Sequence, residues 1–448
     1  MDPMATPERN DPALAGFGRR TLLTLALTPE DAEEMECLPG LERFRWLAAG
    51  DDEALGNPEI CRPAEAVAAV MAAARGQGAG VHGIIAFDDY PASLVAAAAG
   101  RALGLPGPAP ESLLRCHHKY WSRLIQRQAV PEAVPRFCVI DPARPYRADE
   151  VGLDFPFWLK PIKASLSYLG FRINSLPEFE RACARASAEL PSHTRAFDEF
   201  LALHPGARPA GAEPVPGHWL IAEELMGGRQ CTFEAFFHAG RMTALGVIDT
   251  VRHSHCPSFR RFDYPSSLPR RAQEAMAGIA EAVMRRIGFD DGLYDFEFFW
   301  DPRAPVPRII EINPRFCSQF GDLYAKVDGT SSHRVLAELA AGEPPRWTRR
   351  AGPHQVAASF VLRRFKDAMV TRSPDAGDLA RLKERLPDAR VHLCAQRGDR
   401  LSELAQDAYS YRYALINLGA GDRAQLFERF RLAASLLPYE FAPATSRK

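Results

Sequence analysis

The stretch LYDFEFFWDPRAPVPRIIEINPR, residues 293–315, decides how this chain is interpreted. Two runs rich in Phe, Ile and Tyr flank a turn that contains three prolines, which is typical of two strands joined by a loop. Because side chains alternate between faces along a strand, Asp295 and Glu297 are expected on one face, and Phe296 and Phe298 on the other. The stretch therefore predicts a β-hairpin.

The second strand of this hairpin is expected to place four residues on one face: Ile309, Glu311, Asn313 and Arg315. If the hairpin is symmetric about Ala304, Glu297 lies opposite Glu311, and Asp295 lies opposite Asn313. Like charges directly opposite each other destabilise a sheet, so a cation is expected between the two glutamates.

Two carboxylates and an amide, with no sulfur or imidazole nearby in the sequence, are ligands that suit Mg²⁺ or Mn²⁺. The predicted metal ligands are Glu297, Glu311 and Asn313. The alternative is a half-buried hairpin whose polar face meets water, and spacing alone does not decide between the two.

The composition narrows the class of protein. A chain of 448 residues is too long for one ordinary core and predicts several domains or subdomains. Hydrophobic residues make up 46% and charged residues 25%, which is enough apolar material for a globular fold. The net charge of −1 shows no basic excess, so neither nucleic acid nor a membrane is expected as a partner.

The nine cysteines include no CxxC pair, which indicates reduced thiols in a cytoplasmic protein rather than a disulfide framework or a zinc site. No apolar run approaches membrane-spanning length. Arg19 and Arg20 precede TLLTLALT and could be mistaken for a twin-arginine export signal, but the apolar run is short. A first buried strand is the better interpretation.

From Thr21 onward, short apolar runs alternate with Ala-rich helical stretches, which predicts a parallel sheet covered by helices. The letters of GxGxxG occur at 78–83, but they precede a strand instead of following one, so a glycine-rich helix exit is expected there. A GxxxxGK[ST] phosphate loop does not occur in the sequence.

Glu297, followed on the next strand by Glu311-Ile-Asn313-Pro-Arg315, resembles the metal-binding signature of the ATP-grasp superfamily. Members of that superfamily use ATP to join a carboxylate to an amine or another nucleophile. The resemblance covers nearly the whole chain and is most specific at the hairpin. It implies ATP and Mg²⁺ (or Mn²⁺) as cofactors, and Arg315 as the catalytic group that stabilises charge on an acyl phosphate or its tetrahedral successor.

The resemblance assigns two lysines to the nucleotide phosphates. Lys119 begins a helix at the family's phosphate-directed position, although composition alone favours a solvated lysine. Lys160 emerges from an apolar strand, where a lone buried ammonium is costly unless it meets an anion. The loop 163–170 resembles the family's flap over the triphosphate, with Ser165 and Ser167 as contacts, but it is poorer in glycine and serine than the family pattern.

The segment WLIAEELM, residues 219–226, resembles the link between the two ATP-grasp lobes, which contacts the adenine and the ribose. The resemblance carries four residues to the nucleotide site, with their individual roles open: Glu223, Glu224, Leu225 and Met226. A solvated strand edge is the alternative for Glu223. Glu234 is a weaker candidate for orienting a phosphate-binding lysine.

The loop 251–269 contains YPSSL, which resembles a turn that lines the acceptor pocket in peptide-forming ATP-grasp ligases. Arg260 and Arg261 are candidates for holding a substrate carboxylate, and solvated loop arginines are the alternative. Three potential zinc ligands in this loop lack a partner pair elsewhere, so a zinc site is not expected: His253, His255 and Cys256.

The expected fold class is α/β, with α+β character in the ATP-grasp part. Four successive parts are expected: a disordered tail at 1–17, a doubly wound parallel-sheet domain at 18–115, a two-lobed ATP-grasp domain with antiparallel sheets at 116–345, and a small α/β closing domain at 346–448. The small lobe is expected at about 135–222 and the large lobe at about 223–345.

The function expected from the resemblance is ATP-dependent joining of a carboxylic acid, activated as an acyl phosphate, to an amine, with amino acids among the candidate substrates. A biotin-carboxylase-like or kinase-like enzyme is the alternative within the superfamily. A nucleotide-binding regulatory protein without catalysis is the alternative from another class. A homodimer is the default expectation for assembly.

Overall fold

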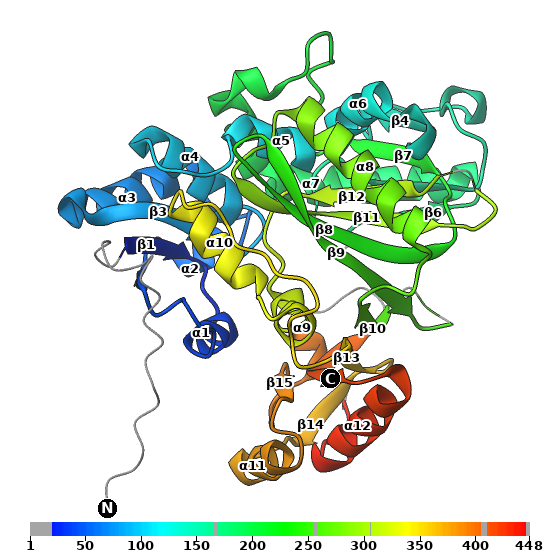
Figure 1. The fold of residues 1–448 in the computed structure, drawn as a ribbon. Helices are drawn as coiled ribbons and strands as arrows, with labels where there is room; N and C mark the ends of the chain where they lie inside the picture. Colours follow the sequence, from blue (N-terminus) through cyan, green and yellow to red (C-terminus); the bar gives the residue numbers. More distant parts are fainter. Residues whose placement is uncertain are drawn as a thin grey trace, which may run out of the picture.

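The computed structural model describes residues 20–164, 168–254, 256, 258–304, 306–404 and 410–444. The predicted tail at 1–17, Ser165, Ser167 and His255 lie outside the described residues. Figure 1 shows three parts along the chain: an N-terminal α/β part in blue, a central part in cyan to yellow, and a C-terminal part in orange and red.

The N-terminal part is a parallel sheet with strand order β2-β1-β3 and helices between the strands. Its elements are β1 (Arg20–Leu25), α1 (Pro29–Glu36), β2 (Phe44–Ala48), α2 (Asp52–Gly56), α3 (Pro63–Gly76), η2 (Gly78–Gly80), β3 (Val81–Ala86) and α4 (Ala92–Leu103). The glycine-rich stretch at 78–83 leads from α3 into β3, as the sequence predicted.

A later helix, α10 (Ser332–Ala340), lies beside this sheet (Figure 1). A Cβ atom added to Gly83 of β3 would lie 2.0 Å from the carbonyl oxygen of Ala340. Glycine therefore permits the close contact between β3 and the end of α10. Two helices connect the N-terminal part to the small lobe: α5 (Pro110–His117) and α6 (Lys119–Ala129).

The small lobe is an antiparallel sheet with strand order β4-β7-β5-β6 and one long helix. Its elements are η3 (Pro131–Ala133), β4 (Phe137–Ile140), η4 (Ala148–Glu150), β5 (Phe157–Pro161), β6 (Phe171–Ile173), α7 (Leu176–Leu203), η5 (Pro205–Ala207) and β7 (Leu220–Glu224). One face packs its apolar residues, including Phe157 and Leu159, on α7 through Phe179 and Leu190. The opposite face carries Lys160 and Glu223.

Helix α7 was absent from the sequence-based expectations. Its 28 residues contain Pro191, a residue that usually breaks a helix, yet buried positions recur at helical spacing on both sides of it, from Phe179 and Cys183 to Phe197 and Phe200. The apolar stripe was therefore present in the sequence, and the internal proline concealed it.

The largest sheet is antiparallel and has strand order β12-β11-β8-β9-β10-β13-β16-β15. Its central elements are β8 (Arg229–His238), β9 (Arg241–Arg252), β10 (Phe259–Tyr264), α8 (Arg270–Ile287), β11 (Gly292–Trp300), β12 (Arg308–Asn313) and α9 (Ser318–Asp328). Helix α8 packs Met276 and Val283 against Phe296 and Phe298 on one face of the sheet.

The C-terminal part continues the same sheet, because β13 pairs with β10. Its elements are β13 (Val356–Arg364), β14 (Ala368–Arg372), α11 (Ala376–Arg385), β15 (Arg390–Leu393), η6 (Leu401–Glu403), β16 (Tyr411–Ala420), α12 (Arg423–Leu436) and β17 (Glu440–Pro443). Strands β14 and β17 form a separate two-stranded sheet. The domain boundaries drawn from the sequence stay predictions.

The expected fold class is confirmed: a mixed α/β chain with one parallel sheet and large antiparallel sheets. Within the ranges given above, no helix is both long and apolar enough to cross a membrane.

Candidate functional site

The predicted hairpin is formed by β11 and β12, and its central register is confirmed. Asp295 pairs with Asn313, and Glu297 pairs with Glu311. The register then shifts, so that Phe298 pairs with Ile309. The expectation that Ile309 shares the face of Glu311 is wrong, because one extra residue in β12 turns Ile309 into the apolar core beside Phe298.

Strand β8 lies on the other side of β11 and extends the polar face of the hairpin. Thr232 pairs with Glu297, and Glu234 pairs with Asp295. The side-chain amide of Gln230 donates a hydrogen bond of 2.9 Å to Oε2 of Glu297. The sequence did not predict Gln230 as a site residue, because its role depends on which strand lies next to β11.

The two glutamates of the hairpin differ in their electrostatics. Burial, together with the carboxylates of Glu311 and Asp295, raises the pKa of Glu297 to about 7. Burial would also raise the pKa of Glu311, but the ammonium groups of Lys119 and Lys160 lower it. Glu297 therefore holds a proton more readily than Glu311, whose charged form Lys119 and Lys160 stabilise.

Asp295 connects the ends of the polar face. Its Oδ1 accepts a hydrogen bond of 2.9 Å from the amide nitrogen of Asn313, and its Oδ2 contacts Nη1 of Arg315 at 2.5 Å. Burial raises the pKa of Asp295, and Arg315 opposes that rise. Because the amide nitrogen of Asn313 is engaged, its amide oxygen is the atom left to bind a cation.

These residues fit a hard divalent cation in part. Glu297, Glu311 and Asn313 offer oxygen donors on adjoining strands, as Mg²⁺ prefers. Among the described residues, however, no group of three or more His, Cys, Asp or Glu side chains is suited to a metal ion. Mg²⁺ usually keeps water or phosphate ligands beside one or two carboxylates, so this donor set fits a cation held jointly with a phosphorylated ligand.

Lys119 begins α6, and its backbone position is fixed by the preceding residue. Nδ1 of His118 caps the helix by accepting from the backbone N–H of Trp121 at 3.2 Å. The ammonium of Lys119 donates to the carbonyl of Ala164 at 2.9 Å and lies 3.0 Å from Oε1 of Glu311. The structure thus brings a predicted phosphate lysine into contact with a predicted metal ligand.

Lys160 lies on the inner face of the small lobe, within 3.0 Å of Oε2 of Glu223. The other oxygen of Glu223 accepts from Nε of Arg123 at 2.7 Å. Glu223 is only 2% exposed, so the alternative of a solvated strand edge is wrong. Burial favours the neutral acid, but Arg123 and Lys160 outweigh it and lower the pKa of Glu223 to about 2.

Arg123 is a second residue that the sequence analysis missed. Its Nη2 donates at 2.7 Å to the carbonyl of Ile310, the bulged residue of β12. The guanidinium therefore joins Glu223 in the small lobe to the strand that carries Glu311. A buried arginine on an amphipathic helix gives no sign in the sequence of what it meets.

Glu224 points to the opposite side of β7 from Glu223, as alternation requires. It contacts Arg308 and accepts from the backbone N–H of Arg136 at 3.0 Å. Leu225 follows with 38% of its surface exposed, which is unusual for a large apolar side chain, and Met226 is partly buried. The end of β7 therefore presents apolar groups beside the polar site.

Glu234 is fully buried, and its Oε2 accepts from the hydroxyl of Tyr324 at 2.8 Å. Burial and the neighbouring Asp295 raise its pKa to about 8. Its contact is thus a tyrosine, whereas the resemblance suggested a lysine.

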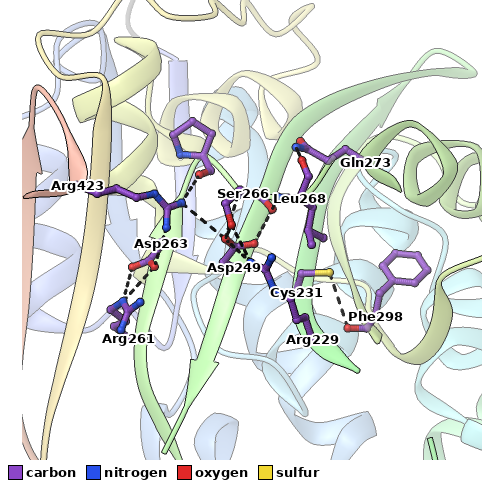
Figure 2. A network of polar contacts seen from close by, with 12 residues as sticks. Arg229, Cys231, Asp249, Arg261, Asp263, Ser266, Leu268, Gln273, Phe298 and Arg423 are labelled. Atoms are coloured by element: carbon purple, nitrogen blue, oxygen red, sulfur yellow. Dashed lines mark hydrogen bonds and ion pairs between the residues drawn. The ribbon is translucent and has the colours of Figure 1, made fainter. Parts of the chain in front are cut away.

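The loop predicted to line an acceptor pocket is held by one carboxylate, as Figure 2 shows. Asp249 of β9 accepts from the hydroxyl of Ser266 at 2.5 Å, and from the backbone N–H of Ser267 at 2.9 Å. Arg229 also reaches Asp249, at 3.1 Å, and Arg423 at the start of α12 lies 3.7 Å away. The turn is therefore anchored to both β9 and the C-terminal part.

Arg261 is engaged within this region, since its Nε donates to Asp263 at 2.9 Å. Its guanidinium also lies 5.0 Å from the ring centre of Phe427. Arg260, next to it, is exposed. The pairing of Arg261 favours a structural role over the binding of a substrate carboxylate.

A further polar cluster lies where the loop after β3 meets α5 and the start of the flap. The ammonium of Lys163 contacts Nδ1 of His117 at 3.2 Å and lies 4.5 Å from the ring centre of Tyr90. Nε2 of His117 lies 3.8 Å from Oδ1 of Asp89. None of these residues was a predicted site residue, because they come from three separate segments.

Three polar atoms in this cluster are buried without a hydrogen-bond partner in the described parts of the chain: Oδ1 of Asp89, Oη of Tyr90 and Nε2 of His117. Burial would raise the pKa of Asp89, but Lys163, His117 and Arg315 hold it below its usual range. Burial lowers the pKa of Lys163 to about 8, against the attraction of Asp89. Unsatisfied polar atoms of this kind are typical of a ligand site.

Comparison with sequences gives one distant relative. No protein-family profile matches the chain. A curated protein of Sinorhizobium fredii (strain NBRC 101917 / NGR234), named uncharacterized protein y4rH, is 26% identical over 269 residues, which cover 59% of this chain and 50% of that protein. The match spans half the length of that relative.

Comparison with solved structures gives likenesses along nearly the whole chain. The L-amino acid ligase from Bacillus licheniformis has a TM-score of 0.72 at 16% identity, covering 95% of this chain and 100% of that one. Biotin carboxylase from Campylobacter jejuni has a TM-score of 0.63 at 13% identity, covering 95% and 92%. N5-carboxyaminoimidazole synthase from Aspergillus clavatus has a TM-score of 0.62 at 12% identity, covering 94% and 99%. The hairpin signature and these likenesses agree, and the chain has the ATP-grasp fold.

Proposed function

We propose that this chain is an ATP-dependent ligase that activates a carboxylic acid as an acyl phosphate and joins it to an amine. The observation that carries the proposal is the convergence of opposite charges from two lobes. Glu297 and Glu311 face each other on β11 and β12, Lys119 lies 3.0 Å from Glu311, and Lys160 is held by Glu223 on the inner face of the small lobe. ATP with Mg²⁺ carries the charges that this set can bind.

The nucleotide would be held by residues from both lobes. Lys119 and Lys160 would bind phosphate oxygens in place of the carboxylates that they contact, Glu311 and Glu223. The exposed Leu225 and the neighbouring Met226 would contact the adenine at the end of β7. Glu297, Glu311 and Asn313 would hold Mg²⁺, which neutralises charge on the phosphates during phosphoryl transfer.

The second substrate region is the cluster at Asp89. A substrate ammonium would offer donors to the unpartnered oxygens of Asp89 and Tyr90, while Arg315, on the strand that carries Glu311, would face the activated carboxyl group. Such positioning brings the two reacting groups together, which is the main contribution that a protein makes to phosphoryl transfer.

The proposed reaction has two balanced steps. A carboxylate oxygen displaces ADP from the γ-phosphorus of ATP, which forms the acyl phosphate. The amine nitrogen then forms a bond to the carbonyl carbon, and inorganic phosphate leaves with one of the original carboxylate oxygens while the nitrogen loses a proton.

The test follows that oxygen. ADP release is measured over a pool of amino acids and other carboxylic acids with Mg²⁺, and an acid that supports turnover is then labelled with ¹⁸O in its carboxylate. Transfer of one ¹⁸O atom to phosphate supports the ligase. Unlabelled phosphate contradicts it, and a stable phosphorylated product formed without amine points to the kinase-like alternative.

The nine cysteines are all free, which supports the proposal that the enzyme works in the reducing environment of the cytoplasm. Its partners would be small molecules. Assembly as a homodimer stays a prediction.

A further inference from the structure

A cavity of about 490 Å³ lies between the N-terminal part and the metal-binding hairpin. Its walls come from β3 and α4, the loop after α4, the start of β11, the residues that follow β12, and α10. That volume falls in the range of small-molecule sites in proteins. None of the predicted functions of Lys119, Lys160 or Glu223 uses this space.

The wall formed by α4 is lined by small residues at helical spacing: Ser93, Ala96, Ala97 and Gly100. Gly100 is buried, yet a Cβ added there would meet no atom of the described chain within 4 Å. The facing wall is aliphatic and includes Leu293, Leu336 and Leu339. The cavity is therefore open space kept clear by the small side chains of α4, and its lining combines these aliphatic side chains with polar atoms in nearly equal share.

Two of the polar residues in the lining are Ser93 and Arg315. Ser93 is 8% exposed, and its hydroxyl oxygen is buried with no hydrogen-bond partner among the described residues. Arg315 also lines the cavity, and its guanidinium contacts Asp295 of the hairpin at 2.5 Å. A polar group of a ligand could thus be satisfied at the end of the cavity that adjoins the candidate site.

The other end reaches solvent. Arg101 and Asp291 belong to the lining, and their side chains are 59% and 37% exposed. Arg101 pairs with Glu111, and Asp291 pairs with His238, so both charges are engaged outside the cavity. The cavity therefore extends from these exposed side chains, past the aliphatic residues of α4 and α10, to Arg315.

We infer that this cavity holds the apolar body of the carboxylic acid substrate, with the carboxylate end directed to Arg315. The inference rests on the proposed function, since it assigns the cavity to the acid that is to be phosphorylated. It names the substrate class as acids with a hydrocarbon body of several carbons. Small polar acids would leave the aliphatic walls unfilled and bind weakly.

The test uses a homologous series of straight-chain acids, from acetate to octanoate. Binding to the full chain is measured by calorimetry, both alone and with Mg²⁺ and a non-hydrolysable ATP analogue. Burial of each added methylene is expected to raise affinity about fourfold until the cavity is filled. Equal affinity for acetate and hexanoate would overturn the inference.

A pair of matched variants locates the effect. Gly100→Leu fills the cavity, and Gly278→Leu makes the same change at an exposed helical glycine of α8, where an added Cβ also meets no described atom within 4 Å. Gly100→Leu is expected to abolish the increase in affinity with chain length. Gly278→Leu is expected to retain that increase. The inference is wrong if Gly100→Leu keeps the same gain. If Gly100→Leu does not fold, Gly100→Ala is expected to end the gain at a shorter acid.

The outcomes separate this inference from the proposed function. Chain-length-dependent binding without ADP release would support the cavity and contradict the ligase. ADP release with short polar acids, unchanged in Gly100→Leu, would support the ligase and contradict the cavity.

Discussion

Glu223 and Glu297 are both glutamates, but their electrostatic surroundings are opposite. Glu223 lies between Arg123 and Lys160, which lower its pKa to about 2. Glu297 is partly buried and lies beside Glu311 and Asp295, and its pKa rises to about 7. In one lobe two cations lower the pKa of the carboxyl group, and in the other neighbouring carboxylates and burial raise it.

This difference in surroundings indicates two roles for a carboxylate, one in stability and one in binding a cation. A carboxylate with two cations within 3.0 Å stabilises the arrangement of its own lobe. A carboxylate that faces other carboxylates is destabilising until a cation arrives. Substitutions of the two glutamates and of their neighbours test whether that contrast holds.

The largest effect is expected for Glu311→Gln. This variant removes one of the two facing carboxylates, so Mg²⁺-dependent ADP release should fall by more than about a hundredfold, beyond the loss that outer partners of a metal site produce. Circular dichroism should show an unchanged fold. Wild-type turnover in the folded variant would show that the hairpin does not bind the metal.

Glu223→Gln is expected to act on stability. It leaves Arg123 and Lys160 buried without their anion, which typically costs about 3–5 kcal/mol. Urea unfolding at neutral pH measures the loss. A change of less than about 1 kcal/mol in the free energy of unfolding would mean that Glu223 contributes no more than a surface ion pair does.

The same variant should alter the acid sensitivity of the fold. The pKa of Glu223 is about 2 in the folded chain against 4.5 as its ordinary value. Its stabilising contribution is therefore full above about pH 4.5 and is lost as the pH falls through about 2. Urea midpoints at neutral pH and at about pH 3 should differ less in Glu223→Gln than in the wild type.

Gln230→Ala removes the amide that donates to Glu297. Outer partners of metal ligands typically contribute about 10–100-fold in metal affinity, so the Mg²⁺ concentration for half-maximal ADP release should rise by at least about tenfold. Gln273→Ala is the matched control, because Gln273 donates to the carbonyl of Leu268, away from the hairpin. Equal effects of the two variants would contradict the role of Gln230.

The smallest effect is expected for Glu281→Gln. Glu281 pairs with Arg285 at 2.7 Å on α8, but both side chains are exposed. Such pairs contribute about 0.3–0.5 kcal/mol, so urea unfolding should detect little change and ADP release none. A larger loss of unfolding free energy would mean that an ion pair without burial is enough to explain the stabilising effect of Glu223.

The sequence predicted the hairpin register because strand side chains repeat every two residues and the polar residues are symmetric about the turn. It could not predict the bulge at Ile310, because a strand contains the same residue types with or without a bulge. It could not place Arg123, Gln230 or Asp89 either, because each acquires its role from a segment distant in the chain.

The pairing of Lys119 and Lys160 also bears on which ligands the site can bind. Lys119 is already neutralised by Glu311, and Lys160 by Glu223. An anion that drew Lys119 away would leave Glu311 without its nearest cation, whereas Glu223 would keep Arg123. An anion that arrives with its own cation would replace the partner that Glu311 loses, so we expect nucleotide and Mg²⁺ to bind more tightly together than either binds alone.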